Sequence, residues 1–316
     1  MTATAERTTR KQARKQDRQT VVDNNALIGH SRVTPYLFST PAIIAVTAVL
    51  AFPVLYGVWQ SLYRPEILGA PVEWVGLQNY ITMFQDDAFW SALYRTALFV
   101  GGCMVVGTSL GLFFAFALYR VVGRLRFLRA VTLAPYLISN VAAAVMFRIL
   151  FNSQFGLVNG VLARFGIEGP SWLSDLNFAM VVVVLAQVWT DLPLTILLLL
   201  GGLMTIDRSY LDAALVDGAS GWQRATRLTI PLLTPQIVIS TVWLSYSTLT
   251  GLGVVLAMTG GGPLHSTTTL AMEMYLTAFR ALKFNDALAI ATFILVLNAL
   301  LTLIYVRVAR KYEIDA

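Results

Sequence analysis

Charged side chains are scarce in this sequence. Only 13% of its 316 residues are Asp, Glu, Lys or Arg, whereas 57% are hydrophobic, and the mean hydropathy is +0.67. Soluble domains carry about 25% charged residues. The composition therefore excludes an ordinary soluble domain and indicates an integral membrane protein.

Cysteine and histidine are almost absent. The single cysteine, Cys103, lies inside an apolar run, so an internal disulfide is excluded. The two histidines, His30 and His265, are far apart in the sequence and lie beside turn residues. We therefore expect neither a histidine-based metal site nor a catalytic triad within this chain.

Nucleotide-binding and catalytic motifs are also missing. The sequence has no Gly-x-x-x-x-Gly-Lys-Ser/Thr phosphate loop and no Gly-Lys pair, so the chain is not expected to bind ATP or another cofactor. Gly218-Ala219-Ser220-Gly221 does not match the nucleophile elbow Gly-x-Ser-x-Gly. No spanning segment carries paired carboxylates on one helix face. We therefore expect no catalytic residues.

Long apolar runs dominate the rest of the chain. Each is near or above the roughly 20 residues that cross a bilayer as a helix. The runs are continuous rather than alternating, which excludes membrane-spanning strands. We predict an all-α, polytopic membrane protein whose six transmembrane helices form a domain over residues 34–316. The predicted spans are Tyr36–Tyr63, Phe89–Tyr119, Ala130–Phe151, Phe178–Met204, Leu232–Met258 and Ala287–Ala309.

Positive charge predicts the orientation of these spans. Residues 1–33 carry seven Lys/Arg against three acids and few apolar side chains, which predicts a disordered, basic cytoplasmic tail with possible contact to anionic lipid. With the connection Arg120–Arg129, the 205–230 loop and the C-terminus, 17 of the 23 Lys/Arg fall on one side of the membrane. By the positive-inside rule both termini are cytoplasmic. This distribution also argues against a nucleic-acid partner.

The segment Tyr210–Pro231 is a polar interruption with the signals of two short helices. Ser209 and Asp212 form a capping-box pattern that predicts a helix start, and Gly218 is a natural helix stop. Ser220 and Gln223 form a second capping box, so the chain is expected to restart at once. A solvated linker between two spans is the simpler alternative. However, small residues at Ala213, Ala214 and Ala219, followed by a lone Trp222, favour a helix that inserts into a partner's groove.

The same residues resemble the EAA loop of ABC-importer permeases. The match comprises Asp212-Ala213-Ala214, Asp217-Gly218-Ala219, Trp222 and Pro231, with Asp212 where the family usually has Glu. The resemblance implies that the coupling loop, residues 205–231, docks on a cytoplasmic ATPase. The residues that it assigns to coupling are Tyr210, Asp212, Ala213, Ala214, Asp217, Gly218, Ala219 and Trp222.

Other motifs extend the resemblance over most of residues 36–310. Gly76-Leu77-Gln78-Asn79-Tyr80 resembles the family's GL-x-NY element, and Thr259-Gly260-Gly261-Gly262-Pro263 resembles a signature of sugar-type permeases. The resemblance implies a type I ABC-importer permease fold in a prokaryotic cell membrane. It also implies a second, homologous permease subunit, two ATPase subunits that hold ATP and Mg²⁺, and an extracytoplasmic solute-binding protein or lipoprotein.

Polar residues inside the predicted spans are the candidates for a solute path. Asp191 lies near the middle of the fourth span, just before Pro193, and Gln187 is one helical turn away on the same face. The fifth span offers five residues with hydroxyl groups between Ser245 and Thr250, Ser247 among them. Hydrogen bonding between helices is the alternative role. The candidates for the solute path are Asn140, Gln187, Trp189, Asp191, Ser245, Tyr246 and Thr248.

Hydroxyls, amides, one acid and aromatic rings are the groups that bind sugars. We therefore expect a permease for a carbohydrate, a di- or oligosaccharide. The same architecture could take up glycerol phosphate or a polyol instead. A secondary transporter independent of an ATPase and a membrane-embedded enzyme are weaker alternatives. Trp74, Trp90 and Trp172, near the predicted outer surface, fit an interfacial aromatic belt.

Overall fold

The structure is a computed structural model that describes residues 34–64, 73–121, 131–132 and 134–313. The predicted basic tail, residues 1–33, lies outside the described residues. The chain divides into two units, Met1–Tyr56 and Gly57–Ala316. Among the described residues the regular structure is helical, apart from one isolated bridge between Tyr63 and Trp74. This agrees with the all-α prediction.

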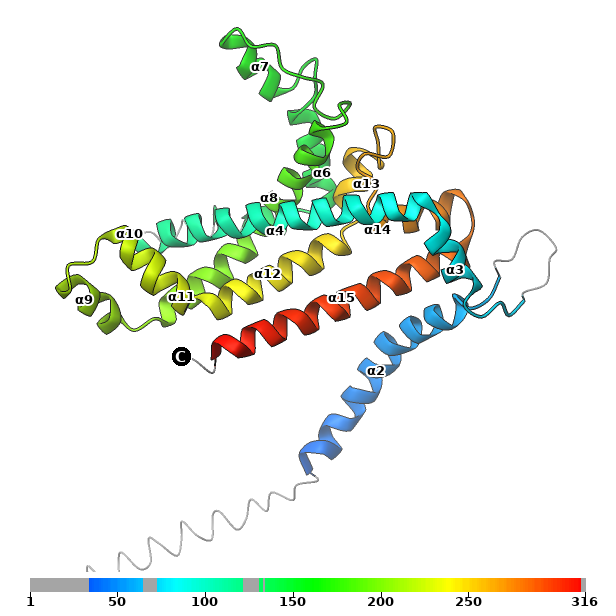
Figure 1. Ribbon diagram of the computed structural model, residues 1–316, viewed down its shortest axis with the longest axis horizontal. Helices are drawn as coiled ribbons and strands as arrows, with labels where there is room; N and C mark the ends of the chain where they lie inside the picture. The colour runs from blue at the N-terminus through cyan, green and yellow to red at the C-terminus, as the bar shows by residue number, and fades with distance from the viewer. Residues whose placement is uncertain (1–33, 65–72, 122–130, 133, 314–316) are drawn as a thin grey trace, which may run out of the picture. The chain divides into compact units, whose positions relative to one another are not determined.

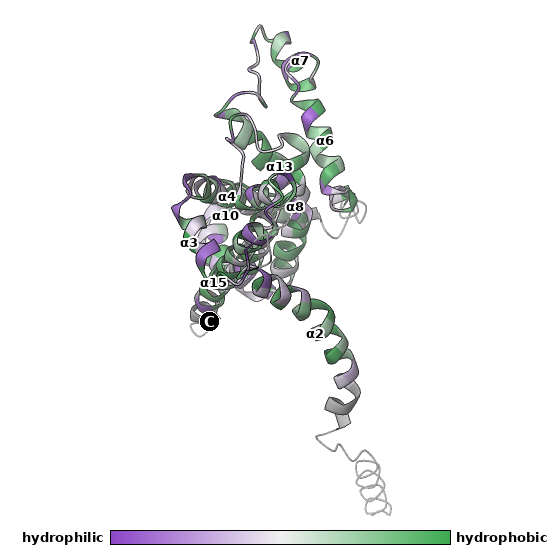
Figure 2. Ribbon diagram, turned by 90° about the vertical axis from the view of Figure 1, so that its right-hand side faces the viewer, coloured by the Kyte–Doolittle hydropathy of each residue, from purple (hydrophilic) through white to green (hydrophobic). Residues whose placement is uncertain are grey.

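The first unit holds most of helix α2, Thr34–Gln60. Its apolar side chains point all round the helix, and Figure 2 shows hydrophobic residues along most of it. Side chains such as Val49 and Leu55 are about two-thirds exposed, at 69% and 67%. A helix that is hydrophobic on every side suits a lipid environment, so α2 has the surface expected of the first predicted span.

Two residues of the GL-x-NY motif, Asn79 and Tyr80, form hydrogen bonds near the start of the second unit. Asn79 is buried in α3, Gln78–Gln85, and its Nδ2 donates to the carbonyl oxygens of Ser61 and Tyr63, both at 2.7 Å. The Ser61 and Tyr80 hydroxyls lie 2.6 Å apart. Asn285 donates to the carbonyl of Tyr63 as well, at 3.1 Å. These side chains satisfy carbonyls in the turn that follows α2.

Long helices form the centre of the second unit. They are α4 (Asp87–Val121), α8 (Phe178–Thr205), α12 (Thr234–Leu249) and α15 (Phe284–Glu313). Helix α8 is the most buried, and it packs against α4 and α12. Helix α12 also packs against α15, as Figure 1 shows. The core of the unit therefore surrounds α8, which carries Asp191.

Small residues allow this close packing. A Cβ on Gly107 would lie 3.1 Å from Leu244 of α12, and one on Gly111 would lie 2.6 Å from Thr195 of α8. The Gly107-x-x-x-Gly111 pattern thus lets neighbouring helices approach α4, as small residues do in membrane bundles.

Two of the predicted spans are not single helices. The third, Ala130–Phe151, includes a short 3₁₀ turn, η1 (Ala134–Leu137), and α6 (Asn140–Leu150). In the fifth, Leu232–Met258, helix α12 ends at Leu249 and a separate helix, α13 (Gly253–Met258), follows. The expectation of continuous helices there was wrong. Pro135 and the Gly251-x-Gly253 sequence fall at the two breaks, where these residue types interrupt helices.

By length and composition, four described helices can cross a membrane, or five if a bent pair counts as one span. The pair joins Gly221–Leu232 to Thr234–Leu249 at an angle of 69°. The 11-residue α6 is apolar but short for a span on its own. Six spans with cytoplasmic termini remains the prediction from sequence.

Shorter helices complete the second unit. After α6 come α7 (Leu157–Arg164) and, beyond α8, the helices of the coupling loop described below. The connection between α13 and α15 contains α14 (Leu270–Tyr275), continued by the π-helical turn η3 (Leu276–Arg280). Thr269 caps α14, accepting from the Met272 amide at 3.4 Å.

Candidate functional site

The first helix of the coupling loop, α9, spans Arg208–Val216. Its N-cap is Asp207, whose Oδ1 accepts from the Ser209 amide at 2.9 Å. The predicted cap at Ser209 was therefore wrong by two residues. The hydrogen bonds from Ser209 lower the pKa of the fully exposed Asp207. A charged carboxylate at this position accepts a hydrogen bond from a free backbone amide. It also interacts favourably with the positive N-terminal end of the helix dipole.

Gly218 ends α9 as predicted. Its φ is +74°, a left-handed conformation that glycine adopts without the strain of a side chain. The amides of Gly218 and Ala219 donate to the carbonyls of Leu215 (3.1 Å) and Ala214 (3.0 Å). This pair of bonds is the Schellman motif, which satisfies two free carbonyls at a helix end. Asp217 occupies the C-cap position.

The second helix restarts immediately, and its predicted capping box is confirmed. The Ser220 amide donates to Gln223 Oε1 at 2.8 Å, and the Gln223 amide donates to Ser220 Oγ at 3.3 Å. Helix α10 (Gly221–Gln223) continues through the π-helical turn η2 (Arg224–Thr229) into α11 (Ile230–Leu232). Pro231 lies in the first turn of α11, as expected.

The coupling loop exposes large apolar side chains. Val216 is 88% exposed, Trp222 78% and Tyr210 56%. Of the other residues assigned to coupling, Ala214 and Ala219 are half-buried, and Asp212, Ala213, Asp217 and Gly218 are exposed. Two capped helices thus present an exposed surface from which the indole ring of Trp222 projects.

Asp191 lies at the centre of a buried polar cluster. Gln187 Nε2 donates to Asp191 Oδ2 at 2.8 Å, which confirms that these two side chains share one face of α8. The hydroxyl of Ser247, on α12, lies 2.9 Å from Oδ1 and 3.1 Å from Oδ2 of the same carboxylate. We call Gln187, Asp191 and Ser247 the Asp191 cluster. It joins two central helices just before the break that follows α12.

The other candidates for the solute path do not join the cluster. Ser245 and Thr248 are buried, and their hydroxyls donate to carbonyls of their own helix. Tyr246 is 55% exposed. Asn140 is exposed at the first residue of α6, and the Trp189 ring contacts Phe147, with centroids 5.8 Å apart. Sequence spacing could not show which hydroxyl of the fifth span faces Asp191; it is Ser247.

One atom of the Asp191 cluster lacks a partner. Gln187 is 1% exposed, and its Oε1 accepts no hydrogen bond from the described residues. A Cβ on Gly251, at the break after α12, would lie 3.6 Å from this oxygen. Buried polar atoms are normally paired. This acceptor is therefore available to a donor that enters at the break.

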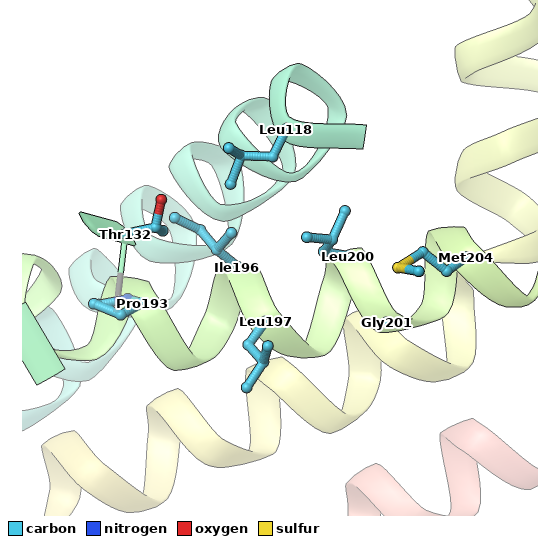
Figure 3. A pocket seen from close by; sticks show the side chains of 8 residues that line it. All are labelled: Leu118, Thr132, Pro193, Ile196, Leu197, Leu200, Gly201 and Met204. Atoms are coloured by element: carbon cyan, nitrogen blue, oxygen red, sulfur yellow. The ribbon is translucent and has the colours of Figure 1, made fainter. Parts of the chain in front are cut away.

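Pro193 lines a different, apolar pocket of about 100 Å³ (Figure 3). Its walls come mainly from α8, including Ile196, Leu197 and Leu200, with Leu118 from α4. The pocket contains neither Gln187 nor Asp191. Its lining suits an alkyl chain rather than a sugar, so the polar candidate site is the Asp191 cluster.

The known proteins that this chain resembles are membrane components of transport systems. Residues 107–314 match the family described as binding-protein-dependent transport system inner membrane component. The sulfoquinovosyl glycerol transport system permease protein SmoG of Agrobacterium fabrum is 33% identical over 294 residues, 89% of this chain and 92% of that protein. The trehalose/maltose transport system permease protein MalF of Thermococcus litoralis is 33% identical over 281 residues, 87% and 93% of the two chains.

A third relative, the sn-glycerol-3-phosphate transport system permease protein UgpA of Agrobacterium fabrum, is 31% identical over 285 residues, 89% of this chain and 96% of that protein. Among solved structures, a chain of a bacterial alginate ABC transporter in complex with alginate pentasaccharide-bound periplasmic protein has a TM-score of 0.75 at 21% identity. The match covers 87% of this chain and 93% of that chain. The similarity shows the type I ABC-importer permease fold.

Proposed function

This chain belongs to the family of binding-protein-dependent transport system inner membrane components, and from that premise we propose that it is one of two membrane subunits of an ABC importer for a carbohydrate. It is a permease subunit of the inner membrane. Its relatives include permeases named for sulfoquinovosyl glycerol and for trehalose and maltose. These names support a solute that contains a sugar.

The coupling loop is the observation that carries the proposal. Trp222 and Val216 project from two capped helices, and Gly218 fixes the turn between them. In the proposed mechanism ATP closes a dimer of separate ATPase subunits, which hold ATP and Mg²⁺. That closure moves the coupling loops of this chain and of a second, homologous permease, so the pair opens outward to receive solute from the binding protein.

The Asp191 cluster is the proposed polar contact along the solute path. Its carboxylate and amide can accept hydrogen bonds from sugar hydroxyls, and Gln187 Oε1 has no donor among the residues that the structure describes. Ionisable residues within a membrane protein are costly to bury and typically line functional cavities. The proposal assigns Asp191 and Gln187 to solute contact and Ser247 to holding the carboxylate.

Cross-linking tests the coupling role. Cys103 is the only cysteine and is fully buried, so Trp222→Cys introduces a single accessible thiol. In membranes that contain the whole transporter, a short thiol cross-linker should join this residue to the ATPase subunit. Adding ATP and Mg²⁺ should change the yield, because the nucleotide moves the coupling loop.

Leu282→Cys provides the matched control, since Leu282 is 65% exposed in the connection before α15, which is predicted to lie outside the cell. It should give no cross-link to the ATPase. Equal cross-linking of both variants, or none from Trp222→Cys in an active transporter, would contradict docking through the coupling loop.

Glycerol phosphate is the second candidate solute, favoured by the 31% identity to UgpA over 89% of this chain. Competition for uptake separates the two. In cells that express the complete transporter, excess maltose or another neutral glycoside should inhibit uptake if the solute is a sugar. Inhibition by sn-glycerol 3-phosphate alone would favour the second candidate.

A further inference from the structure

A polar pocket lies beyond the end of α6, among residues that the proposed function does not use. Its volume is about 370 Å³, within the range of roughly 300–1,000 Å³ typical of small-molecule sites. It is formed by the C-terminal turn of α6, the connection between α7 and α8, and the residues after α13. Its lining includes Arg148, Asn152, Ser153, Ser171, Trp172 and Thr259.

Arg148 supplies an uncompensated positive charge to this pocket. It lies in the last turn of α6 and is exposed. Within the described part of the chain the one ion pair joins Arg64 to Glu73, so Arg148 has no acidic partner there. A guanidinium group presents a planar set of donors that matches carboxylate, sulfonate or phosphate oxygens. The charge therefore favours an anionic ligand.

Asn152 adds an oriented amide beside that charge. Its Oδ1 accepts from the backbone amides of Gln154 at 2.9 Å and Phe155 at 3.1 Å. These bonds fix the side chain through its oxygen, so the Nδ2 group of this lining residue is available as a donor. Together with the hydroxyl groups of Ser153 and Ser171, the pocket offers several hydrogen-bonding groups around one cation.

Trp172 forms a rigid aromatic part of the wall. Its Nε1 donates to Asn159 Oδ1 at 2.6 Å, and Asn159 in turn donates to the Ser153 carbonyl at 3.0 Å. The indole ring also makes edge contacts with Phe151 and Phe178, at centroid separations of 5.6 and 5.4 Å. A fixed ring costs little entropy when a ligand packs against it. This arrangement is more specific than the general interfacial role predicted for Trp172.

We propose that this pocket binds a small polyhydroxylated anion, with Arg148 pairing to its acidic group and Trp172 packing against its carbon skeleton. Two sources have this chemistry: an acidic sugar on its way into the transporter, and the headgroup of phosphatidylglycerol in the outer leaflet. The sugar source rests on the proposed function, whereas the lipid source does not. Neither uses the Asp191 cluster, so the pocket is a separate site.

Two binding measurements on the complete transporter, without ATP, test the site. In nanodiscs of phosphatidylcholine, saturation-transfer NMR titrations compare methyl α-D-glucuronide with methyl α-D-glucoside. Native mass spectrometry then counts phosphatidylglycerol retained by transporter taken from mixed-lipid membranes. Arg148→Gln should weaken glucuronide binding about tenfold, or remove the retained lipid. The loss of one hydrogen bond to a charged group lowers affinity by about this factor. Arg148→Lys should retain part of the affinity.

Arg164→Gln is the matched control, because Arg164 is exposed at the end of α7 and does not line the pocket. An effect of Arg148→Gln on the glucuronide alone identifies the sugar, and an effect on phosphatidylglycerol alone identifies the lipid. If neither measurement separates Arg148→Gln from Arg164→Gln, the site is refuted. Failure of the proposed function is a different result, namely the absence of ATP-driven carbohydrate uptake by the unaltered transporter.

Discussion

The hydroxyl of Ser247 lies within 2.9 and 3.1 Å of the two carboxylate oxygens of Asp191, across the contact between α12 and α8. The two residues are 56 positions apart in the chain. This side-chain hydrogen bond joins two central helices, and Ser247 lies two residues before α12 ends at Leu249. Movement of α12 relative to α8 must stretch or break it.

Ser247→Ala should therefore destabilise the contact between α8 and α12. The substitution leaves one side of the buried Asp191 carboxylate without a donor, which costs about 1–3 kcal/mol. We expect a lower unfolding temperature of the purified transporter and altered uptake. Ser245→Ala is the control, because its hydroxyl bonds only within its own helix, to the Val242 carbonyl. Equal effects of the two variants would count against a special role for Ser247.

Gly111→Ala should destabilise the packing of α4 against α8. The new methyl group would lie 2.6 Å from Thr195 Cγ2 and 3.2 Å from Leu199 Cδ1, and overpacking of this kind costs about 1–3 kcal/mol. Gly101→Ala, on the same helix, meets no atom within 4 Å and should be tolerated. Thermal unfolding of the two variants in detergent measures the difference. Equal stability would show that α4 shifts to accommodate the methyl group.

The sequence predicted helix caps and stops better than it predicted which spans are unbroken helices. The Ser220–Gln223 capping box and the Gly218 stop follow from residue types a few positions apart, and both are confirmed. The breaks in the third and fifth predicted spans were missed because hydropathy measures composition, and Thr250–Leu252 is not polar enough to interrupt an apolar run. The pairing of Asp191 with Ser247 was not specified either, because it depends on how α12 is rotated against α8.

Asp207 gives a prediction about the start of α9. Asp207→Ala removes the acceptor for the Ser209 amide, so amide hydrogen exchange within residues 208–216 should accelerate. Asp207→Asn keeps an acceptor but loses the charge, so its exchange should lie between those of Asp207→Ala and the unaltered protein. Because the folded-state pKa of Asp207 is lowered, its contribution is present above the ordinary Asp pKa and is lost as pH falls through the folded value. Unchanged exchange in Asp207→Ala would show that Ser209 caps the helix instead.

Glu273 gives a pH dependence of the opposite sign. It lies in the first turn of α14, where burial and then the nearby charge of Asp86 raise its pKa, while His265 and Arg95 partly oppose the rise. A raised folded-state pKa means that stability falls as pH rises from the ordinary Glu value, about 4.3, through the folded value. Glu273→Gln should thus raise the unfolding temperature at neutral pH and leave it unchanged at about pH 4.

Glu168→Gln is the control for this measurement, since Glu168 is exposed in the connection after α7. It should leave the unfolding temperature unchanged at both pH values. A gain for Glu273→Gln that is the same at acidic and neutral pH would mean that improved packing, rather than removal of a charge, stabilises the variant.

Gly218 tests whether the turn between α9 and α10 transmits force. A side chain at φ +74° strains the backbone by about 1–2 kcal/mol, and most strongly when the residue is β-branched. Uptake should therefore be highest in Gly218→Asn, lower in Gly218→Ala and lowest in Gly218→Val, while the amount of protein in the membrane stays constant.

Space does not limit these variants, because a Cβ at Gly218 meets no atom within 4 Å. Gly221→Ala, in the same loop but without a positive φ, should transport normally. Normal uptake by Gly218→Val would show that the fixed turn is not needed for coupling.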